Sequence, residues 1–311
     1  MTAKRIILAG GSGFLGTLLA RALAARGDSV VVLTRRPSLR EDEVREESWD
    51  GRTVGHWAGL LNGAHGVFNF AGRSIDCRFT EKNRREIIAS RVNSTRAIGE
   101  AIRRCAEPPA VWVQAAGDAI YGDSDDRWHD ETSPPGAGFL VETCRLWEQA
   151  FNESPTPKTR RMLTRIGFVL SAEGGALPKL AGLARWGLGG RAGNGRQYIS
   201  WIHAQDLVRI FLRALDSQGM EGVFNATAPN PVTNDEFMRE LRRALHRPWS
   251  PPVPAWAVRV GGWLMGTEPA LALTGRRCRP KRLVDLGFRF RSPELGRALA
   301  EIYGGVNGWN G

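Results

Sequence analysis

Short apolar runs alternate with longer amphipathic stretches along the first 115 residues of the chain. The runs at 5–8 and 30–33 are almost wholly apolar, as strands are when helices cover both faces of their sheet. Between them, leucine and alanine recur at helical spacing from Gly13 to Arg26, and Gly27 ends the pattern. This alternation predicts a parallel sheet with crossover helices.

The same criteria predict further elements downstream. These are strands at 66–70, 110–113, 161–166 and 222–225, and helices at 80–105, 138–153 and 203–215. After Asn225 the alternation gives way to helices separated by proline turns, one of them opened by a capping-box sequence at Thr233 and Glu236.

The fold class that this pattern predicts is α/β: a Rossmann-like, doubly wound parallel sheet with a smaller, mainly helical carboxyl-terminal lobe. We expect the sheet domain to span residues 1–225, with 171–200 contributing to the substrate lobe. The helical lobe should span 226–305. No repeat or long linker separates the two, so we expect them to pack together.

A glycine-rich turn joins the first predicted strand to the first predicted helix. It comprises Gly10, Gly11, Ser12, Gly13, Phe14, Leu15 and Gly16. In this context one glycine makes a tight turn, one lets the backbone approach a pyrophosphate, and one lets the helix pack on the strand. The first amides of the helix then face the phosphates. We therefore predict a dinucleotide-binding site at residues 10–16.

The residues after the second predicted strand indicate which dinucleotide binds. Sites that prefer NAD usually carry an acid there, which accepts hydrogen bonds from the ribose hydroxyls. This chain has Thr34, Arg35 and Arg36 instead, and no acid before Glu41. Guanidinium groups offer planar, charged donors to a 2′-phosphate. The sequence therefore predicts NADP(H) as the cofactor.

Composition removes several other classes of protein. Four separated cysteines without a CxxC pair argue against a disulfide framework or a zinc site, and the five histidines show no metal-ligand spacing. We expect no metal. No apolar run approaches the roughly 20 residues of a membrane helix. We expect a cytoplasmic protein with no membrane partner.

The net charge of +11 permits an anionic metabolite, a nucleic acid or an acidic membrane surface as a partner. Basic residues gather in the acid-free stretch 174–204 and again at 276–282, where a solvated basic face is the plainer interpretation. The basic runs lack the interleaved aromatic residues of a nucleic-acid motif, so we expect no nucleic-acid partner. We therefore expect a small-molecule substrate, for which an anionic group is one option. The sequence does not indicate the oligomeric state.

An ordered series of motifs follows the glycine turn. It comprises Asn69-Phe70-Ala71-Gly72, Arg78-Phe79-Thr80, Ser90-Arg91-Val92, Phe139-Leu140, Cys144, Trp147-Glu148, Gly174-Gly175-Ala176-Leu177, Ser200-Trp201-Ile202-His203, Asp206, Asn225-Ala226 and Pro231-Val232-Thr233-Asn234. With these motifs the chain resembles the extended short-chain dehydrogenase/reductase superfamily, and within it an atypical epimerase-like group labelled as sugar-epimerase or cell-division-inhibitor homologues. The resemblance implies a nicotinamide near Asn69 to Gly72, with Phe70, Ala71 and Gly72 as cofactor contacts, and an adenine near Trp49-Asp50. Asp50 could instead be an ordinary loop acid.

The broader superfamily uses a Tyr-x-x-x-Lys pair, in which the lysine lowers the pKa of the tyrosine and the tyrosine exchanges a proton with the reacting oxygen. Aligned on Glu148, these positions hold Leu140 and Cys144. The position of the helper serine holds Ala116, and that of the helper asparagine holds Arg91. The resemblance therefore predicts the cofactor site without the usual catalytic residues.

Other residues are candidates for the missing roles. Tyr121 and Asp118 follow the fifth strand and are candidate proton donors, although Tyr121 could simply pack beneath the cofactor loop and Asp118 could be an ordinary loop acid. Trp201 and His203 are candidate substrate contacts, with a helix cap as the plainer role of His203. Arg91 is a candidate contact for a cofactor phosphate or a substrate anion, with a pair to a neighbour on its helix as the alternative.

Two functions fit this sequence. The first is an NADP(H)-dependent oxidoreductase or epimerase that acts on a small carbonyl or sugar-like compound with non-standard catalytic residues. The second is a non-catalytic NADP(H)-sensing protein that regulates a partner, favoured by the loss of the tyrosine, lysine and serine.

Overall fold

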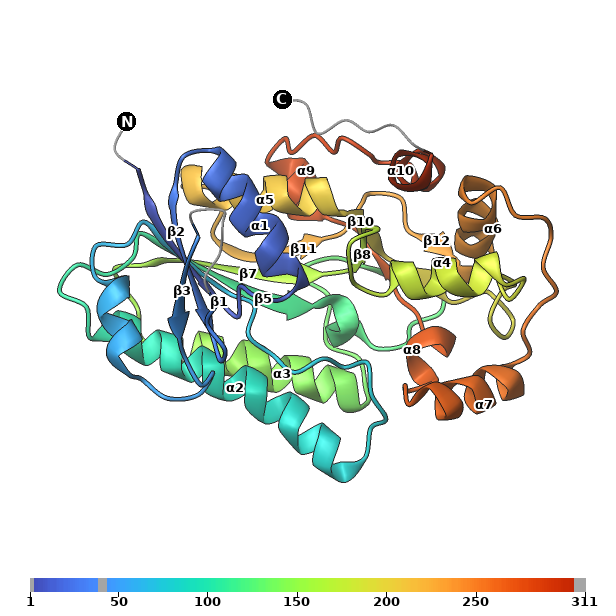
Figure 1. The fold of residues 1–311 in the computed structure, drawn as a ribbon, viewed down its shortest axis with the longest axis horizontal. Helices are drawn as coiled ribbons and strands as arrows, with labels where there is room; N and C mark the ends of the chain where they lie inside the picture. Colours follow the sequence, from blue (N-terminus) through green and yellow to red (C-terminus); the bar gives the residue numbers. More distant parts are fainter. Residues whose placement is uncertain (1–2, 39–43, 305–311) are drawn as a thin grey trace.

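Seven parallel strands form the central sheet, in the order β11-β7-β5-β4-β1-β2-β3 (Figure 1). The computed structural model describes residues 3–38 and 44–304. The strands are β1 (Arg5–Ala9), β2 (Ser29–Thr34), β3 (Arg45–Ser48), β4 (Gly66–Asn69), β5 (Val111–Gly117), β7 (Arg160–Ile166) and β11 (Gly222–Ala226). Strand order reverses between β1 and β4, which is the point where open α/β sheets bind ligands. The doubly wound α/β prediction is confirmed.

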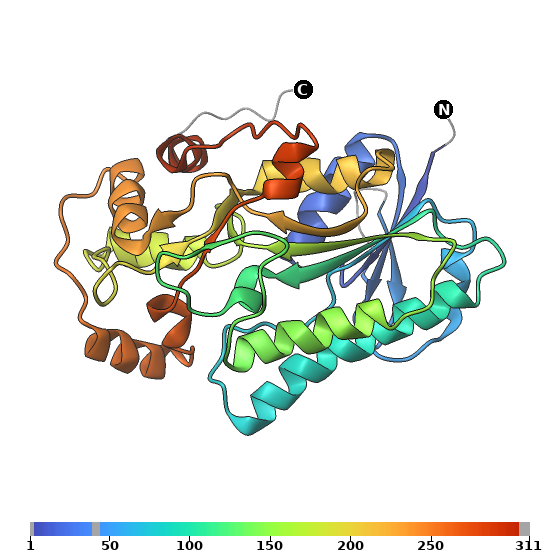
Figure 2. The same cartoon turned by 180° about the vertical axis from the view of Figure 1, so that it is seen from behind.

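Helices cover both faces of the sheet because successive residues of its strands point to opposite sides. In β1, Ile6 and Leu8 pack in the cluster that contains the inward residues of α1 (Phe14–Ala25) and α5 (Ala204–Asp216). Ile7 and Ala9 pack instead against α2 (Glu81–Arg103) and α3 (Phe139–Asn152). Figures 1 and 2 show the two pairs of helices on opposite sides of the sheet.

Two of the helices begin at caps that the sequence provides. The side chain of Thr80 accepts a hydrogen bond from the amide of Asn83 at the start of α2. At the start of α6 (Asn234–Ala244), Thr233 and Glu236 form the predicted capping box, with both reciprocal hydrogen bonds present. These caps fix where each helix begins.

The carboxyl-terminal lobe consists of short helices and two-stranded ladders. Its helices are α4 (Leu177–Arg185), α6, α7 (Ala255–Met265), α8 (Ala270–Leu273), α9 (Lys281–Asp285) and α10 (Leu295–Tyr303). The ladders pair β8 (Phe168–Leu170) with β10 (Trp201–His203), β9 (Tyr198–Ile199) with β12 (Val232–Thr233), and β6 (Trp128–His129) with β13 (Arg277–Cys278). Side chains of α4, α6 and α10, including Leu177, Phe237 and Leu299, form one core, whereas Leu283 of α9 packs in the sheet-domain cluster. The boundary at residue 225 stays a prediction.

A buried carboxylate attaches this lobe to the sheet domain. Asp206 lies on α5 and is fully buried. Its oxygens accept hydrogen bonds from the amides of Arg291 at 2.9 Å and Ser292 at 3.1 Å, and Arg209 pairs with it at 2.8 Å. A buried charge is stable only with such partners, so the segment before α10 is held against α5.

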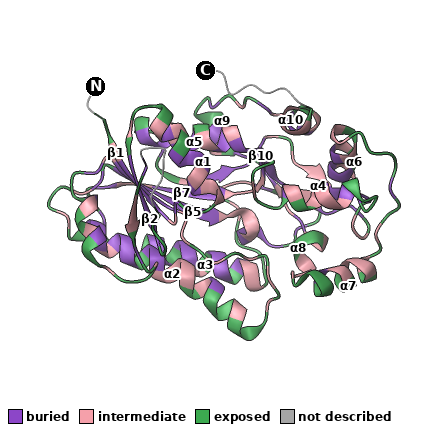
Figure 3. Cartoon of the chain, in the orientation of Figure 1, coloured by how far each residue is buried: buried purple, intermediate pink, exposed green. Residues whose placement is uncertain are grey.

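Most helices are buried on the side that faces the protein interior, and Figure 3 shows that α7 differs from them. The sheet and the inward faces of α1, α2, α3 and α5 are buried, whereas α7 is intermediate or exposed along nearly its whole length. Among the described residues, no helix combines the length and the apolar character needed to cross a bilayer.

Candidate cofactor site

A cavity of about 1100 Å³ lies at the carboxyl ends of β1, β2 and β4. Many of the predicted cofactor residues line it: Gly10, Ser12, Gly13, Thr34, Arg35, Arg36, Asp50, Phe70, Ala71 and Gly72. Phe14, Leu15, Gly16 and Arg91 do not line it. The position is the one expected for a ligand at the switch point of the strand order.

The glycine turn is packed against neighbouring backbone. Gly10 has a φ of +70°, and a Cβ atom there would lie 2.7 Å from the Cα atom of Ala71. A Cβ atom on Gly16 would lie 2.3 Å from the Cα atom of Gly11. These positions therefore accept only glycine, the first for its backbone conformation and for space and the second for space.

Helix α1 opens toward the cavity without a side-chain cap. Its N-cap residue is Gly13, which lines the cavity, and its first turn holds no acid. Free amides at a helix start attract anions such as a pyrophosphate. Phe14, the first helical residue, packs under a second glycine turn, because a Cβ atom on Gly174 would lie 2.5 Å from its ring.

One end of the cavity is strongly cationic. Arg35 and Arg36 are exposed and line it, and Arg52 from the loop after β3 joins them. The hydroxyls of Ser12 and Thr34 lie 3.0 Å apart and tie the glycine turn to the end of β2. Three guanidinium groups around one wall suit a phosphate group.

Asp50 and Arg52 both line the cavity, but Asp50 holds its own loop in place whereas Arg52 adds a guanidinium group to the wall. Asp50 lines the cavity, but its oxygens accept hydrogen bonds from the amide of Arg52 at 2.8 Å and the amide and hydroxyl of Thr53 at 2.9 and 2.7 Å. Its carboxylate therefore shapes the loop. Arg52 was not predicted as a cofactor residue. The Asx turn that begins at Asp50 is the only local feature of the sequence that places Arg52 in this loop.

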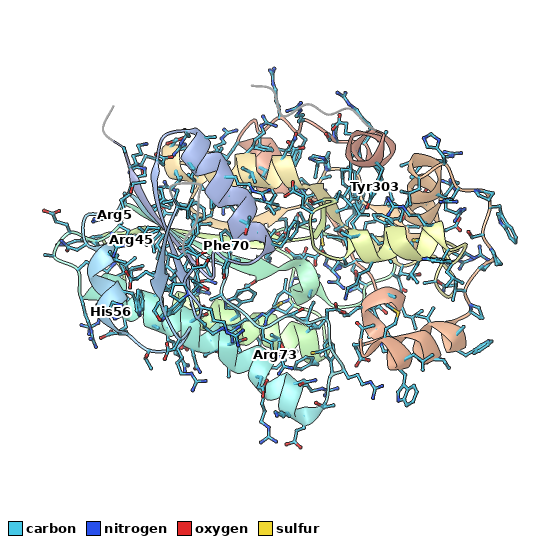
Figure 4. The ribbon with its side chains drawn as sticks, viewed as in Figure 1. Arg5, Arg45, His56, Phe70, Arg73 and Tyr303 are labelled. Atoms are coloured by element: carbon cyan, nitrogen blue, oxygen red, sulfur yellow. The ribbon has the colours of Figure 1, made fainter. Side chains whose placement is uncertain are left out.

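The opposite end of the cavity is built by the segment after β4, from which Figure 4 labels Phe70 and Arg73. The buried amide of Asn69 accepts a hydrogen bond from Ala71 N at 3.1 Å and donates one to Gln114 at 3.0 Å. The amide of Arg73 donates to Ser90 Oγ at 2.9 Å. Asn69 and Ser90 thus position the backbone of 71–73 from the sheet and from α2.

Arg91 lies directly behind this segment. Its Nη1 donates to the carbonyl oxygens of Arg73 at 2.9 Å and Ile87 at 3.1 Å, and no carboxylate among the described residues pairs with it. A Cβ atom on Gly72 would meet its Cζ atom at 3.3 Å. Burial lowers the pKa of Arg91 below its usual value. A guanidinium group without a counter-ion therefore stands beside the predicted nicotinamide position.

The positions of the missing catalytic pair lie on α3. Leu140 is in its first turn, and Cys144 is buried one turn later. Burial, and next the charge of Glu148, raise the pKa of the Cys144 thiol to about 12. The thiol is therefore protonated near neutral pH and is a poor nucleophile.

Tyr121 is fixed in the core. Its ring is 1% exposed, and its hydroxyl lies 2.8 Å from both Asp130 O and Asn225 Oδ1 and accepts a hydrogen bond from Arg165 at 2.9 Å. Arg165 is held in turn by a bidentate pair with Glu148. This position gives the predicted catalytic role of Tyr121 no support.

Asp118 occupies a different environment at the end of β5. It pairs with Arg276 of the helical lobe at 3.0 Å, and both side chains keep some exposure to solvent. Burial raises the pKa of Asp118, and the guanidinium of Arg276 opposes that rise. Gly117, just before it, lies beside Cys144, since an added Cβ atom would be 3.6 Å from its Sγ atom. Asp118 is therefore the predicted proton donor that remains near α3.

The predicted substrate contacts Trp201 and His203 have structural partners. The buried indole of Trp201 donates to Asn230 O at 2.9 Å, and the buried imidazole of His203 accepts a hydrogen bond from Gln205 N at 3.2 Å to cap α5. Neither lines the cavity. Across residues 3–38 and 44–304, no cluster of histidine, cysteine and acidic side chains could hold a metal.

Comparisons with known proteins bear on this site. Residues 6–138 match the NAD dependent epimerase/dehydratase family, and residues 253–302 match a domain of unknown function, DUF1731. Epimerase family protein SDR39U1 of Bos taurus is 36% identical over 304 residues, covering 96% of this chain and 99% of the relative. The chain belongs to this epimerase family. Epimerase family protein YfhF of Bacillus subtilis is 34% identical, covering 96% and 97%.

Solved structures of family members agree with the fold. Human SDR39U1, solved with NADPH, superposes with a TM-score of 0.87 at 33% identity, covering 97% of this chain and 100% of that one. A nucleoside-diphosphate sugar epimerase from Corynebacterium glutamicum gives a TM-score of 0.78 at 29% identity, covering 97% and 59%. The resemblance to the atypical epimerase-like group is confirmed, and the NADPH of the human relative agrees with the cofactor predicted here.

Proposed function

We propose that this epimerase-family chain is an NADP(H)-binding oxidoreductase that acts on a small carbonyl or sugar-like compound without a Tyr-x-x-x-Lys pair. The observation that carries the proposal is the cavity of about 1100 Å³, which runs from three arginines to the segment after β4. A bound cofactor would supply or accept the hydride. The protein contributes the binding, the orientation and the electrostatics.

Each end of the cavity has a distinct role in this proposal. Arg35, Arg36 and Arg52 hold the 2′-phosphate, and the start of α1 with Gly13 holds the pyrophosphate. The backbone at Ala71 then holds the nicotinamide end. The human relative was solved with NADPH, and its fold superposes over nearly the full chain, which supports NADP(H) as the occupant of this cavity.

Arg91 takes the electrostatic part of the missing lysine in this proposal. The lysine of the usual pair supplies a positive charge near the nicotinamide ribose, and Cys144 at its position cannot. The Arg91 guanidinium lies against Gly72 on the other side of that segment and lacks a carboxylate partner among the described residues. A preorganised cation of this kind stabilises negative charge that develops during reaction.

Asp118 is the proton donor in this proposal. The positive charges of Arg276 and Arg91 favour a substrate that is anionic or rich in oxygen. The ion pair between Asp118 and Arg276 joins the end of β5 to the helical lobe, where a substrate cleft of this fold lies. The raised pKa of the Asp118 carboxyl suits an acid that gives up its proton during catalysis.

The experiment is a substrate screen with purified protein, NADPH or NADP+, and panels of carbonyl compounds and nucleotide sugars. We expect a change in cofactor absorbance or in the sugar configuration that Asp118→Asn lowers by about a hundredfold, within the usual range for loss of an acid catalyst. Asp118→Asn should leave NADPH affinity unchanged. If the protein turns over none of the compounds and the cofactor is neither oxidised nor reduced, that result would argue against catalysis.

One observation favours a second function, NADP(H) sensing. The hydroxyl of Tyr121 is engaged in the core and positions 116, 140 and 144 hold alanine, leucine and cysteine, so the usual catalytic groups are absent from the described site. A sensor must bind its partner with different affinities in its NADPH-bound and free states. Affinity capture of partners with and without NADPH measures that difference, and equal capture rules out the sensor.

A further inference from the structure

Helix α7 is mostly exposed within the described molecule, although Arg78 donates to the Trp263 carbonyl oxygen and lies over the Trp263 ring. Of its eleven residues only Gly262 is buried. Trp256 is 67% exposed, Trp263 61% and Leu264 70%. Soluble proteins rarely leave large apolar side chains exposed together, and such patches mark interaction sites. The helix therefore presents a surface that needs a partner.

The exposed residues form a continuous stripe. Trp256, Val260, Trp263 and Leu264 stand at positions i, i+4, i+7 and i+8 and therefore share one face of the helix. Arg259 is the only charged residue of the helix. We call Trp256, Val260, Trp263 and Leu264 the α7 surface.

Further exposed aromatic residues lie at the same end of the lobe. The segment after α4 is hydrogen-bonded to the segment before α7, with Gly193 N donating to Val253 O at 2.8 Å and Val253 N donating to Arg191 O at 2.9 Å. The first segment follows Trp186, which is 86% exposed, and the second follows Trp249, which is 74% exposed. In Figure 1 both segments run along the edge of the molecule that α7 occupies.

The two stretches that build this end of the lobe carry charge of one sign. No acid occurs in 174–205 or in 241–267. They carry eight basic residues, namely Lys179, Arg185, Arg191, Arg196, Arg242, Arg243, Arg247 and Arg259. Acids from other segments also lie here and are engaged, since Asp76 pairs with Lys179, Glu240 pairs with Arg243, and Glu268 accepts a hydrogen bond from Phe79 N. Six of the eight basic residues remain without these partners. The partner should therefore carry negative charge.

We propose that the α7 surface binds peripherally to a bilayer that contains anionic lipid. Tryptophan is the residue type that favours the boundary between headgroups and acyl chains, because its ring is apolar and its N–H remains polar. Arginines beside an apolar helix add attraction to anionic headgroups. The proposal departs from the expectation of no membrane partner, which rested on the lack of a spanning segment, because peripheral attachment needs none. It is independent of the proposed chemistry.

A second copy of the chain fits this surface less well. Joining two α7 surfaces face to face would bring two arginine-rich regions together, on chains that each carry a net charge of +11. Like charges placed across an interface disfavour association. Anionic lipid satisfies both the apolar stripe and its surrounding charge.

The test is sedimentation of the full-length protein with vesicles of neutral phosphatidylcholine, with and without 30% of anionic phosphatidylglycerol. The matched variants are Val260→Glu on the α7 surface and Val284→Glu on α9, because these valines are 51% and 53% exposed in helices. We expect Val260→Glu to lower the partition onto anionic vesicles by about tenfold or more, through a lost apolar contact and added repulsion. Val284→Glu should bind as the original chain does.

Several outcomes would overturn the proposal. They are an absence of vesicle binding, equal binding to neutral and anionic vesicles, and equal loss in both variants. Self-association in lipid-free solution that Val260→Glu abolishes would assign the surface to a second copy instead. Circular dichroism of both variants establishes that each is folded before the comparison is made.

Discussion

The guanidinium carbon of Arg91 lies 5.0 Å from the centroid of the Trp147 ring. Trp147 is itself anchored, because its Nε1 donates to Thr95 Oγ1 at 3.1 Å. The indole face thus stabilises a cation that has no carboxylate partner among the described residues. A cation held by a ring and by carbonyl oxygens keeps its full charge available to a ligand on the other side of Gly72.

Arg91→Gln tests whether the charge of Arg91 contributes to cofactor binding. We expect the substitution to weaken NADPH binding by about tenfold, because it removes a positive charge that lies behind Gly72 at the nicotinamide end of the cavity. Arg91→Lys should lose less, because it keeps the charge. Arg96→Gln is the control, since Arg96 is exposed on the same helix. Titration of cofactor fluorescence measures each affinity, and an affinity unchanged in Arg91→Gln would remove Arg91 from the site.

Arg35→Glu tests the choice of cofactor. The substitution removes a guanidinium group from the cationic end of the cavity and places a carboxylate there. We expect NADPH affinity to fall by about tenfold to a hundredfold and NADH affinity to change little, because only NADPH carries the 2′-phosphate.

The control for Arg35→Glu is Arg45→Glu. Arg45 is exposed on β3, pairs with Glu47 at 2.8 Å and does not line the cavity. Isothermal titration with both cofactors gives the four affinities. Equal losses for NADPH and NADH would show that Arg35 does not contact the 2′-phosphate.

Gly10→Ala tests the close approach within the glycine turn. Gly10 and Gly27 share a left-handed backbone, with φ of +70° and +81°, but only at Gly10 would a Cβ atom meet neighbouring backbone. Gly27→Ala should therefore cost only the conformational strain, about 1 kcal/mol in free energy of unfolding. Gly10→Ala should cost more and should also abolish NADPH binding. Similar losses in urea unfolding and in cofactor affinity for both variants would contradict this geometry.

His203→Asn tests a pH dependence of stability. Burial lowers the pKa of His203 below its usual value near 6.5, although Glu301 and Asp206 oppose the shift. Between the two pKa values the unfolded chain binds more protons than the folded chain, so the free energy of unfolding decreases as the pH falls below about 6.5. Protonation at Nδ1 would also remove the cap that Gln205 N donates to.

Asparagine can cap the helix without titrating. His203→Asn should therefore unfold with a smaller loss of stability between pH 7 and pH 5 than the original chain. The control is His246→Asn, at an exposed residue whose φ of 52° asparagine tolerates. If both variants keep the original pH profile, His203 does not contribute to it.

Apolar periodicity predicted the sheet domain because buried strands and helices repeat at fixed spacing. The helix predicted at 80–105 is α2, and the strand predicted at 161–166 is β7, each within two residues at its ends. Periodicity gave no signal for β3, whose residues 45–48 read Arg-Glu-Glu-Ser. This edge strand forms through main-chain hydrogen bonds to β2, which a side-chain pattern does not encode.

The sequence predicted only those site residues that lie in short contiguous motifs. Gly10, Ser12 and Gly13 of the turn and the arginines after β2 line one cavity, because short motifs on adjoining elements fix their own position. The pair of Asp118 and Arg276 joins residues 158 positions apart, and no local motif announces it. For Tyr121, its place at a strand end left a cleft residue and a packed ring as alternatives, and only the distant partners Asn225 and Arg165 show that its hydroxyl lies in the core.

The carboxylate of Asp206 restricts how this protein can be divided. Its helix belongs to the sheet domain, while two of its donors are amides from the segment before α10. A chain cut near residue 225 would leave that charge buried without those donors, and the removed piece would expose the donors to water. The carboxyl-terminal region of this chain is therefore not a transferable module: a gene fusion or an exchange must carry Asp206 and its two donor amides together.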